Sequence, residues 1–204
     1  VFSNAYIVDE KLGKTGKTLW EAIGFYVNKD QLIFERADRN FLDELNRHNV
    51  VTGMCMAFKG MYKDELLPFS NYSIHDVWIT YRMNQLGKIV ALNKPEVLYR
   101  QHGNNVIGVQ KSVKRSMKNR NTYYERVIFR IKFIEDILEK CKDNKLLCDY
   151  NNYLLYLNRR RNFLTKKTTF FNVFFDLISY KKYEYKWKEI ILKDIYTRWS
   201  MKDK

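Results

Sequence analysis

Apolar and polar residues follow a strand-like pattern in the first half of this chain and a helical pattern in the second half. Residues 1–8 form an apolar run that predicts a buried strand. Residues 49–58 predict a second strand, in which Gly53 indicates a close approach to the backbone. Residues 9–17 are typical of a polar loop, and residues 18–46 are too weakly periodic to be assigned an element.

A helix that begins near Ser73 is the most strongly marked element of the first half. Its apolar residues fall on one face at helical spacing, namely Ile74, Val77, Trp78, Tyr81 and Leu86. Ser73 and Asp76 have the spacing of a capping box, and Gly87 is a typical helix end. We therefore expect a capped amphipathic helix between Ser73 and Gly87.

Two strands are expected at residues 89–92 and 97–100, joined by a turn at residues 93–95. After about residue 110 the apolar positions recur with the helical period, which predicts a series of amphipathic helices. The last of these helices has an apolar face made of Trp187, Ile190, Ile191, Ile195 and Trp199. The expected fold class is therefore α/β, followed by an all-α tail.

Charge is distributed unevenly between the two halves. The 204 residues carry a net charge of +14. Residues 1–100 hold 13 basic and 12 acidic residues, whereas residues 101–204 hold 24 basic and 11 acidic ones. This asymmetry indicates that the first half carries the chemistry and that the second half is attracted to an anionic partner.

Cysteine usage and apolar run length indicate the compartment. Cys55, Cys141 and Cys148 have no metal-binding spacing, which is typical of reduced core cysteines in a cytoplasmic protein. No apolar run approaches the roughly 20 residues needed to span a bilayer. The chain opens at Val1 within a strand-like run and shows no signal peptide, so we expect a cytoplasmic protein of which this sequence is a fragment.

Two short polar strings are the candidates for chemistry. His75-Asp76 lies at the start of the marked helix, and Tyr99-Arg100-Gln101-His102-Gly103, with Asn105, follows the last strand of the first half. These strings resemble family 2 glycosyltransferases of the GT-A fold in their order along the chain. Further matching pieces are Val1–Ala5, Val8-Asp9, Gly53–Phe58 and Leu66-Leu67-Pro68. The resemblance is to bacterial surface-polysaccharide enzymes, often described as rhamnosyltransferase-like.

The resemblance implies a division of the chain into two regions. Residues 1–108 would be the acceptor-side, C-terminal half of a GT-A (Rossmann-like) catalytic domain, and residues 109–204 a basic helical region. The N-terminal donor-binding part, with its metal-binding Asp-x-Asp motif, would precede Val1. The fragment alone is therefore expected to be inactive.

The resemblance also implies roles for individual residues. Asp76 would be the general base that removes the proton of the acceptor hydroxyl, because a sugar hydroxyl is a poor nucleophile until that proton leaves. Arg100 would neutralise diphosphate charge, and His75 and Asn105 would contact substrate or diphosphate. His102 would face the diphosphate or a divalent Mn or Mg ion, which is expected to be held mainly by the missing part.

Each of these residues also has a structural interpretation. Asp76 alone is consistent with a helix cap, and His102 with an ordinary loop histidine. Arg100 at a strand end is consistent with a surface ion pair. His75 is consistent with a solvent-facing structural residue.

The expected function is inverting transfer of a sugar from a nucleotide-sugar donor to a glycan or lipid-linked acceptor. It would serve bacterial cell-surface polysaccharide synthesis at the inner face of the cytoplasmic membrane. The alternative is a non-enzymatic basic helical module that binds nucleic acid or anionic membrane. The basic tail fits a solvated face or contact with anionic lipid better than nucleic acid, because it contains no zinc-finger spacing or RNA-binding motif.

Overall fold

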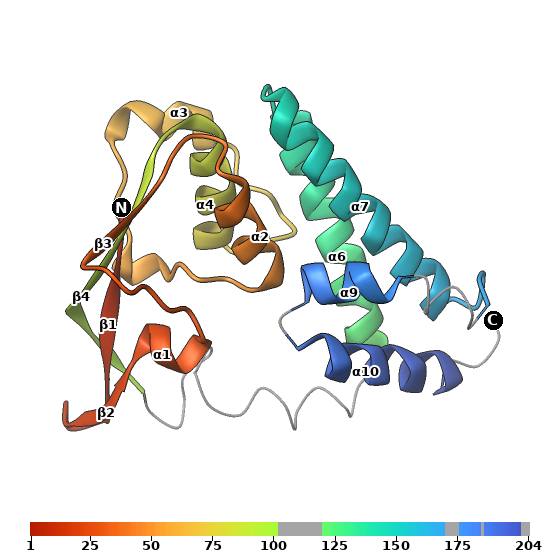
Figure 1. Cartoon of the computed structure of the whole chain (residues 1–204), viewed down its shortest axis with the longest axis horizontal. Coiled ribbons are helices and arrows are strands. Elements are labelled where there is room, and N and C mark those ends of the chain that lie inside the picture. Colours follow the sequence, from red (N-terminus) through yellow and green to blue (C-terminus); the bar gives the residue numbers. More distant parts are fainter. Residues whose placement is uncertain (102–119, 170–175, 185, 201–204) are drawn as a thin grey trace. The chain divides into compact units, whose positions relative to one another are not determined.

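The computed structural model describes residues 1–101, 120–169, 176–184 and 186–200 (Figure 1). They form two compact units, each considered by itself. Unit 1 contains Val1–Asp38, Asn49–Phe69 and the described residues from His75 to residue 101. Unit 2 contains Arg39–His48, Ser70–Ile74 and the described residues from 120 onward.

A mixed sheet forms the centre of unit 1 (Figure 1). Its strands are β1 (Phe2–Val8), β2 (Lys14–Thr18), β3 (Gln31–Phe34) and β4 (Ile89–Arg100), in the order β2-β1-β4-β3. β1 and β4 are parallel, and the other two pairs are antiparallel. The strand predicted at residues 1–8 is confirmed, as is the α/β class, whereas β2 lies in the segment predicted to be a loop.

A polar turn explains how β2 arises from a segment without apolar residues. The carboxylate of Asp9 accepts the N–H groups of Lys11 and Gly13, both at 2.8 Å, and so reverses the chain after β1. The cation of Lys14 then lies 3.6 Å from the centroid of the Tyr6 ring. The hairpin therefore depends on turn chemistry rather than on an alternating apolar pattern.

β4 is one 12-residue strand, so the predicted hairpin with a turn at residues 93–95 is wrong. Both predicted strands exist, but each pairs with β1 instead of with the other. Ser3 lies opposite Leu92 and Ala5 lies opposite Val97, so residues 93–96 bulge out of the ladder. The amide of Asn4, on β1 beside this bulge, donates to the Asn93 side chain at 3.3 Å.

The strand predicted at residues 49–58 is also wrong. Residues Gly53–Cys55 form the 3₁₀ turn η1, and only Met56 makes an isolated bridge, to Phe2. β2 pairs with β1 only between Tyr6 and Val8, which leaves the beginning of β1 open on that side. Val1 and Ala57 exchange backbone hydrogen bonds there, both at 2.9 Å.

The predicted helix after Ser73 is confirmed as α4 (His75–Leu86), which ends at Gly87. The capping box is not formed, because the helix begins two residues after Ser73, whose hydroxyl donates to the carbonyl of Ile74 at 3.3 Å. The polar side chains of the helix are buried as well as its apolar ones, namely Asp76, Thr80, Arg82, Asn84 and Gln85. The expectation of a single buried face was therefore wrong.

Three short helical elements complete unit 1: α1 (Leu19–Ile23), η2 (Gly60–Tyr62) and α3 (Lys63–Leu66). A capping box between Thr18 and Glu21 starts α1, and the side-chain oxygen of Asn4 accepts the N–H of Trp20 at 3.1 Å. α1 is thereby fixed directly against β1.

All the regular secondary structure of unit 2 in its described residues is helical, as the pattern after residue 110 predicts for that part of the chain. It consists of α2 (Arg39–Arg47), α6 (Arg120–Glu139), α7 (Asn144–Leu164), α9 (Leu177–Tyr183) and α10 (Trp187–Ser200). Its core is made of aliphatic and aromatic side chains, including Ile131, Phe133, Ile134, Ile137, Leu146, Tyr150 and Leu157. No helix in the described part of the chain has the length and apolar character that crossing a bilayer requires.

The predicted apolar face of α10 lies inward except at its end, because Trp187, Ile190, Ile191 and Ile195 are partly buried. The fully buried residues of the helix are polar, with Asp194 1% and Thr197 4% exposed. Trp199, which was assigned to the apolar face of the helix, is 76% exposed, and Leu192 is 67% exposed. The side of α10 that packs into the unit is therefore mixed, with polar residues at its most buried positions.

Candidate functional site

The carboxylate of Asp76 is fixed by backbone groups at the start of α4. Its Oδ2 accepts the N–H of Gly53 at 3.1 Å, and its Oδ1 accepts the N–H of Val77 at 2.7 Å. The N–H groups of the first helical turn have no partner within the helix, so a carboxylate there satisfies one of them and faces the positive end of the helix dipole. Asp76 is only 7% exposed, so these two hydrogen bonds to the backbone, rather than water, hold its carboxylate in place.

Gly53 brings the turn η1 against the start of α4. A Cβ atom at residue 53 would lie 2.7 Å from Nε2 of His75 and 3.6 Å from the Cβ of Asp76. The close approach predicted for Gly53 is therefore confirmed, and the group that approaches is the imidazole of His75. His75 is exposed, so Gly53, His75 and Asp76 form a small group with one side open to solvent.

Cys55 attaches this group to the sheet. It is buried with Ala5 and Leu19, and the partly buried side chains of Val97 and Tyr99 pack against the same cluster. Burial raises the pKa of its thiol, as expected of a structural cysteine. Through Cys55, the turn that holds Asp76 rests on the end of β4.

The second polar string begins at the carboxyl edge of the sheet. Arg100 is the last residue of β4, is exposed and lies opposite Val8, whose carbonyl accepts the N–H of Gln101 at 2.8 Å. His102 and Asn105 lie outside the described residues, as does the metal role of His102. Among the described residues, no group of three or more His, Cys, Asp or Glu side chains is placed to hold a metal ion.

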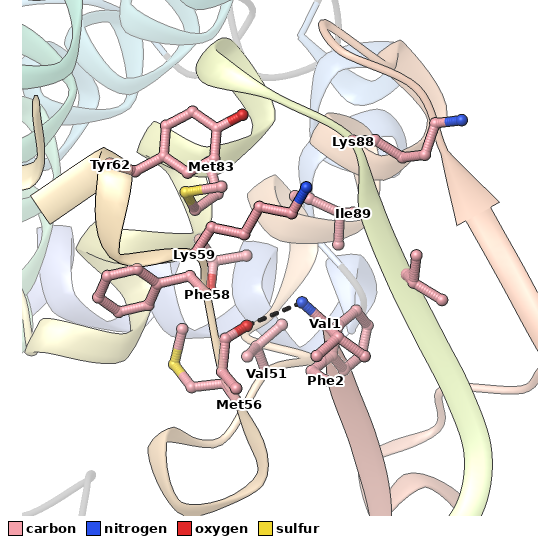
Figure 2. Close-up of a pocket in the computed structure, with 13 residues that line it drawn as sticks. Val1, Phe2, Val51, Met56, Phe58, Lys59, Tyr62, Met83, Lys88 and Ile89 are labelled. Atoms are coloured by element: carbon pink, nitrogen blue, oxygen red, sulfur yellow. Dashed lines mark hydrogen bonds between the residues drawn. The ribbon is translucent and has the colours of Figure 1, made fainter.

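A cavity of about 410 Å³ lies at the amino edge of the same sheet (Figure 2). Its walls are mainly apolar and include Val51, Met56, Phe58, Met83, Ile89 and Val90. Lys88, also at its wall, turns away and pairs with Glu35 at 3.0 Å. Sequence reasoning missed this cavity because the apolar run at residues 49–58 was assigned to a strand.

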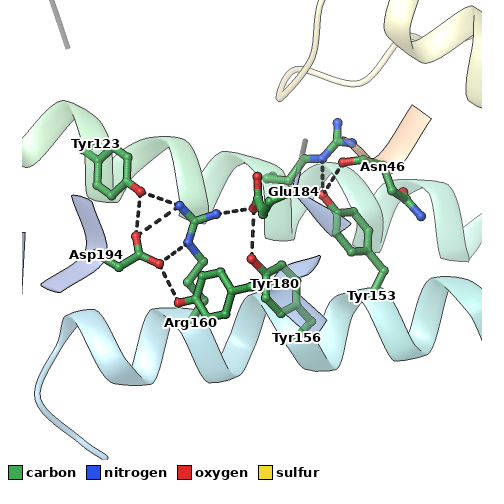
Figure 3. Close-up of polar contacts among 9 residues, drawn as sticks. Asn46, Tyr123, Tyr153, Tyr156, Arg160, Tyr180, Glu184 and Asp194 are labelled. Atoms are coloured by element: carbon green, nitrogen blue, oxygen red, sulfur yellow. Dashed lines mark hydrogen bonds and ion pairs between the residues drawn. The ribbon is translucent and has the colours of Figure 1, made fainter. Parts of the chain in front are cut away.

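A buried polar cluster lies in unit 2 and was also missed (Figure 3). We call it the Arg160 network; its members are Tyr123, Tyr156, Arg160, Tyr180, Glu184 and Asp194. Arg160 donates to Asp194 and to Glu184, both at 2.7 Å, and to the hydroxyl of Tyr123 at 2.6 Å. Arg160 is 8% exposed, so this is an ion-pair cluster removed from water.

Tyrosine hydroxyls complete the hydrogen bonding of the two carboxylates. Tyr180 and Tyr123 each donate to Asp194 at 2.6 Å, and Tyr156 donates to Glu184 at 3.0 Å. Burial raises the pKa values of all three tyrosines, so they stay neutral donors. The arrangement is that of a structural core: its charges are opposite, neighbouring and satisfied by hydrogen bonds.

Comparison with known proteins returned no match to a family model, a curated protein or a solved structure.

Gly53→Ala tests the contact between η1 and His75. The backbone of Gly53 does not require positive φ, so alanine should stabilise the protein by about 0.4–1 kcal/mol wherever space allows. In the wild type the imidazole of His75 occupies that space, and the gain should be lost. Thermal unfolding of the single and double variants should show the gain only in the His75→Ala background; additive effects would contradict the contact.

Arg160→Met tests the network. We expect the free energy of unfolding to fall by about 3–5 kcal/mol in urea titrations, because two carboxylates lose their buried counter-charge. The neighbouring Arg159→Met is the matched control. Arg159 pairs with Asp176 but has a side chain that is 54% exposed, so its loss should amount to less than about 1 kcal/mol. Equal losses in the two variants would show that the network is not the stabilising element.

Alkaline pH should weaken unit 2. The raised tyrosine pKa values keep the folded state protonated, whereas tyrosines in the unfolded chain lose protons from about pH 10. The contribution of these tyrosines to the free energy of unfolding is therefore fully present below the pKa of tyrosine in the unfolded chain. It is lost as the pH rises above that value. Unfolding followed by helical circular dichroism between pH 8 and 11 should show this fall, with a smaller slope in Tyr180→Phe. If Tyr180→Phe left the slope of stability against pH unchanged, the buried tyrosines would not be the cause of the fall.

Proposed function

We propose that this chain is the acceptor-side part of an inverting glycosyltransferase in which Asp76 is the general base. The donor would be a nucleotide-activated sugar, and the acceptor a glycan or a lipid-linked sugar of a bacterial surface polysaccharide. On this proposal, residues 1–108 belong to a GT-A domain. Its support is the resemblance of the two polar strings together with the arrangement around Asp76.

The way Asp76 is held is the observation that carries the proposal. Each of its oxygens accepts one backbone N–H, from Gly53 and from Val77. An ionised carboxylate has about four acceptor positions, so about two remain for another donor. A carboxylate oriented by rigid backbone groups, beside the open side of the group formed with His75, suits the removal of a proton from a bound hydroxyl.

The proposed reaction is a single displacement. The acceptor oxygen forms a bond to the anomeric carbon while its proton passes to Asp76. The bond from that carbon to the nucleoside diphosphate breaks, and the leaving group departs with the electron pair. The configuration at the anomeric carbon is therefore inverted.

Neutralisation of the departing diphosphate is the second requirement. The guanidinium of Arg100, exposed at the carboxyl edge of the sheet, fits this role because arginine binds phosphate oxygens in a bidentate manner. His75, His102 and Asn105 would contact substrate or diphosphate. A divalent ion would stabilise the same charge, but the described residues offer no ligand cluster for it, so no step here depends on it.

Asp76→Asn tests the role of the base. The amide keeps an acceptor oxygen for one backbone N–H but cannot take a proton, so transfer should fall by about 100-fold or more. The measurement is nucleoside diphosphate release by the product of the complete gene, with Mn or Mg, against UDP-, GDP- and dTDP-sugars. Donor binding should be largely retained.

Asp64→Asn is the matched control, because Asp64 is an exposed acid in the first turn of α3. It should release nucleoside diphosphate at the wild-type rate. Thermal unfolding of both variants separates loss of the base from loss of the fold. Wild-type turnover by a folded Asp76→Asn enzyme would end the proposal.

A further inference from the structure

Helix α10 presents apolar side chains to solvent along one face. Leu192 is 67% exposed, Tyr196 53% and Trp199 76%. Their spacing places them in one row, with the exposed Lys188 one turn before Leu192. We call Lys188, Leu192, Tyr196 and Trp199 the α10 stripe.

The opposite face of α10 shows that this exposure is built into the packing of unit 2. Asp194 is fully buried on that face, beside the partly buried Trp187, Ile190 and Ile191, and it is bonded to Arg160 and to the hydroxyls of Tyr123 and Tyr180. A helix that packs on a protein core ordinarily turns its apolar side inward. α10 keeps further apolar residues on its outward side, because the ion pair of Asp194 with Arg160 fixes the rotation of the helix.

Positive charge surrounds the stripe. Lys188 is exposed on α10 and Lys186 just before it, and Lys181 and Lys182 are exposed on α9, which packs against α10. The nearby carboxylates of Asp194, which is buried, and Glu184, which is largely covered, are both paired with Arg160 rather than with these cations. Glu189 is exposed and lies 3.8 Å from Lys186.

We propose that the α10 stripe docks unit 2 on an anionic lipid bilayer, with the helix lying along the membrane surface. At 14 residues α10 is about 21 Å long, too short to cross a hydrocarbon core of about 30 Å. Leu192 and Trp199 would enter the boundary between headgroups and acyl chains, where tryptophan and tyrosine are favoured. The lysines would contact anionic headgroups.

The composition of the stripe favours lipid over the other occupants. Two copies joined through this face by a two-fold axis would bring like-charged lysines together. Nucleic acid offers phosphates for the lysines and bases to stack on the aromatic rings, but no apolar medium for Leu192. A bilayer offers an apolar medium for Leu192, an interface for the aromatic rings and anionic headgroups for the lysines. This inference stands independently of glycosyl transfer.

Binding to vesicles tests the proposal. Wild-type protein should sediment with vesicles of phosphatidylcholine and phosphatidylglycerol, and far less with phosphatidylcholine alone. The double variant Leu192→Ser/Trp199→Ser should bind the mixed vesicles at least about tenfold more weakly. Leu155→Ser, which changes a 50% exposed leucine on α7, is the matched control and should bind as wild type does. Lys188→Gln should weaken binding about fivefold.

Fluorescence quenching locates the contact. The measurement uses a Trp187→Phe background, which removes the partly buried tryptophan at the start of α10. Acyl chains brominated near the headgroup should then quench part of the tryptophan emission on binding, because Trp20 and Trp78 are buried and Trp199 is exposed. Trp199→Phe should still bind the vesicles but lose that quenching. Quenching that persists in this variant would overturn the proposed contact.

Three other results would also overturn the proposal. The first is equal vesicle binding by the double variant and Leu155→Ser. The second is a concentration-dependent dimer that the double variant abolishes, in a protein that ignores vesicles, because the occupant would then be a second copy. The third is stripe-dependent binding of an oligonucleotide without binding of vesicles. Loss of sugar transfer in Asp76→Asn, or its absence altogether, would leave the vesicle results unaffected.

Discussion

The guanidinium of Arg160 lies out of water between the carboxylates of Asp194 and Glu184, and the packing of unit 2 follows from that burial. A buried cation must be paired and fully hydrogen-bonded, so the helices that carry its partners are held to fixed positions and rotations. Tyr123 on α6, Arg160 on α7, Tyr180 on α9 and Asp194 on α10 each contribute one group. The apolar core and this network both contribute to the stability of the unit, and the network also fixes the rotation of α10.

The fold was predictable where one physical rule dominates. β1, α4 and the helices α6, α7 and α10 were found because their apolar patterns are strong, whereas α2 lies in the segment 18–46 that is too weakly periodic to be assigned. β2 was missed because its formation depends on the Asp9 turn, and β3 because it is short and lies in a weakly periodic segment. The burial of Asp194 and the exposure of Trp199 on α10 were missed, because an apolar pattern cannot show that a distant arginine pairs with an aspartate on the inward side.

The candidate site was predictable in its parts but not in its assembly. His75 and Asp76 were chosen as neighbours in sequence, and Gly53 was chosen separately for a close approach. Their meeting depends on η1, a turn where a strand was expected, and on Cys55, which buries that turn against the sheet. Local patterns reveal residues suited to chemistry, whereas the contacts between segments far apart in sequence arise from packing that no local pattern contains.

The bulge at residues 93–96 makes the two halves of β4 independent in register. Before it, Ser3 faces Leu92; after it, Ala5 faces Val97, and the ladder continues to Arg100. Asn93 is fastened separately, its amide donating to the carbonyl of Val27 at 3.0 Å. Insertions or deletions after Asn93 would therefore be absorbed locally, without sliding either half along β1. Evolution could vary the length of this segment while Arg100 remains at the same edge of the sheet.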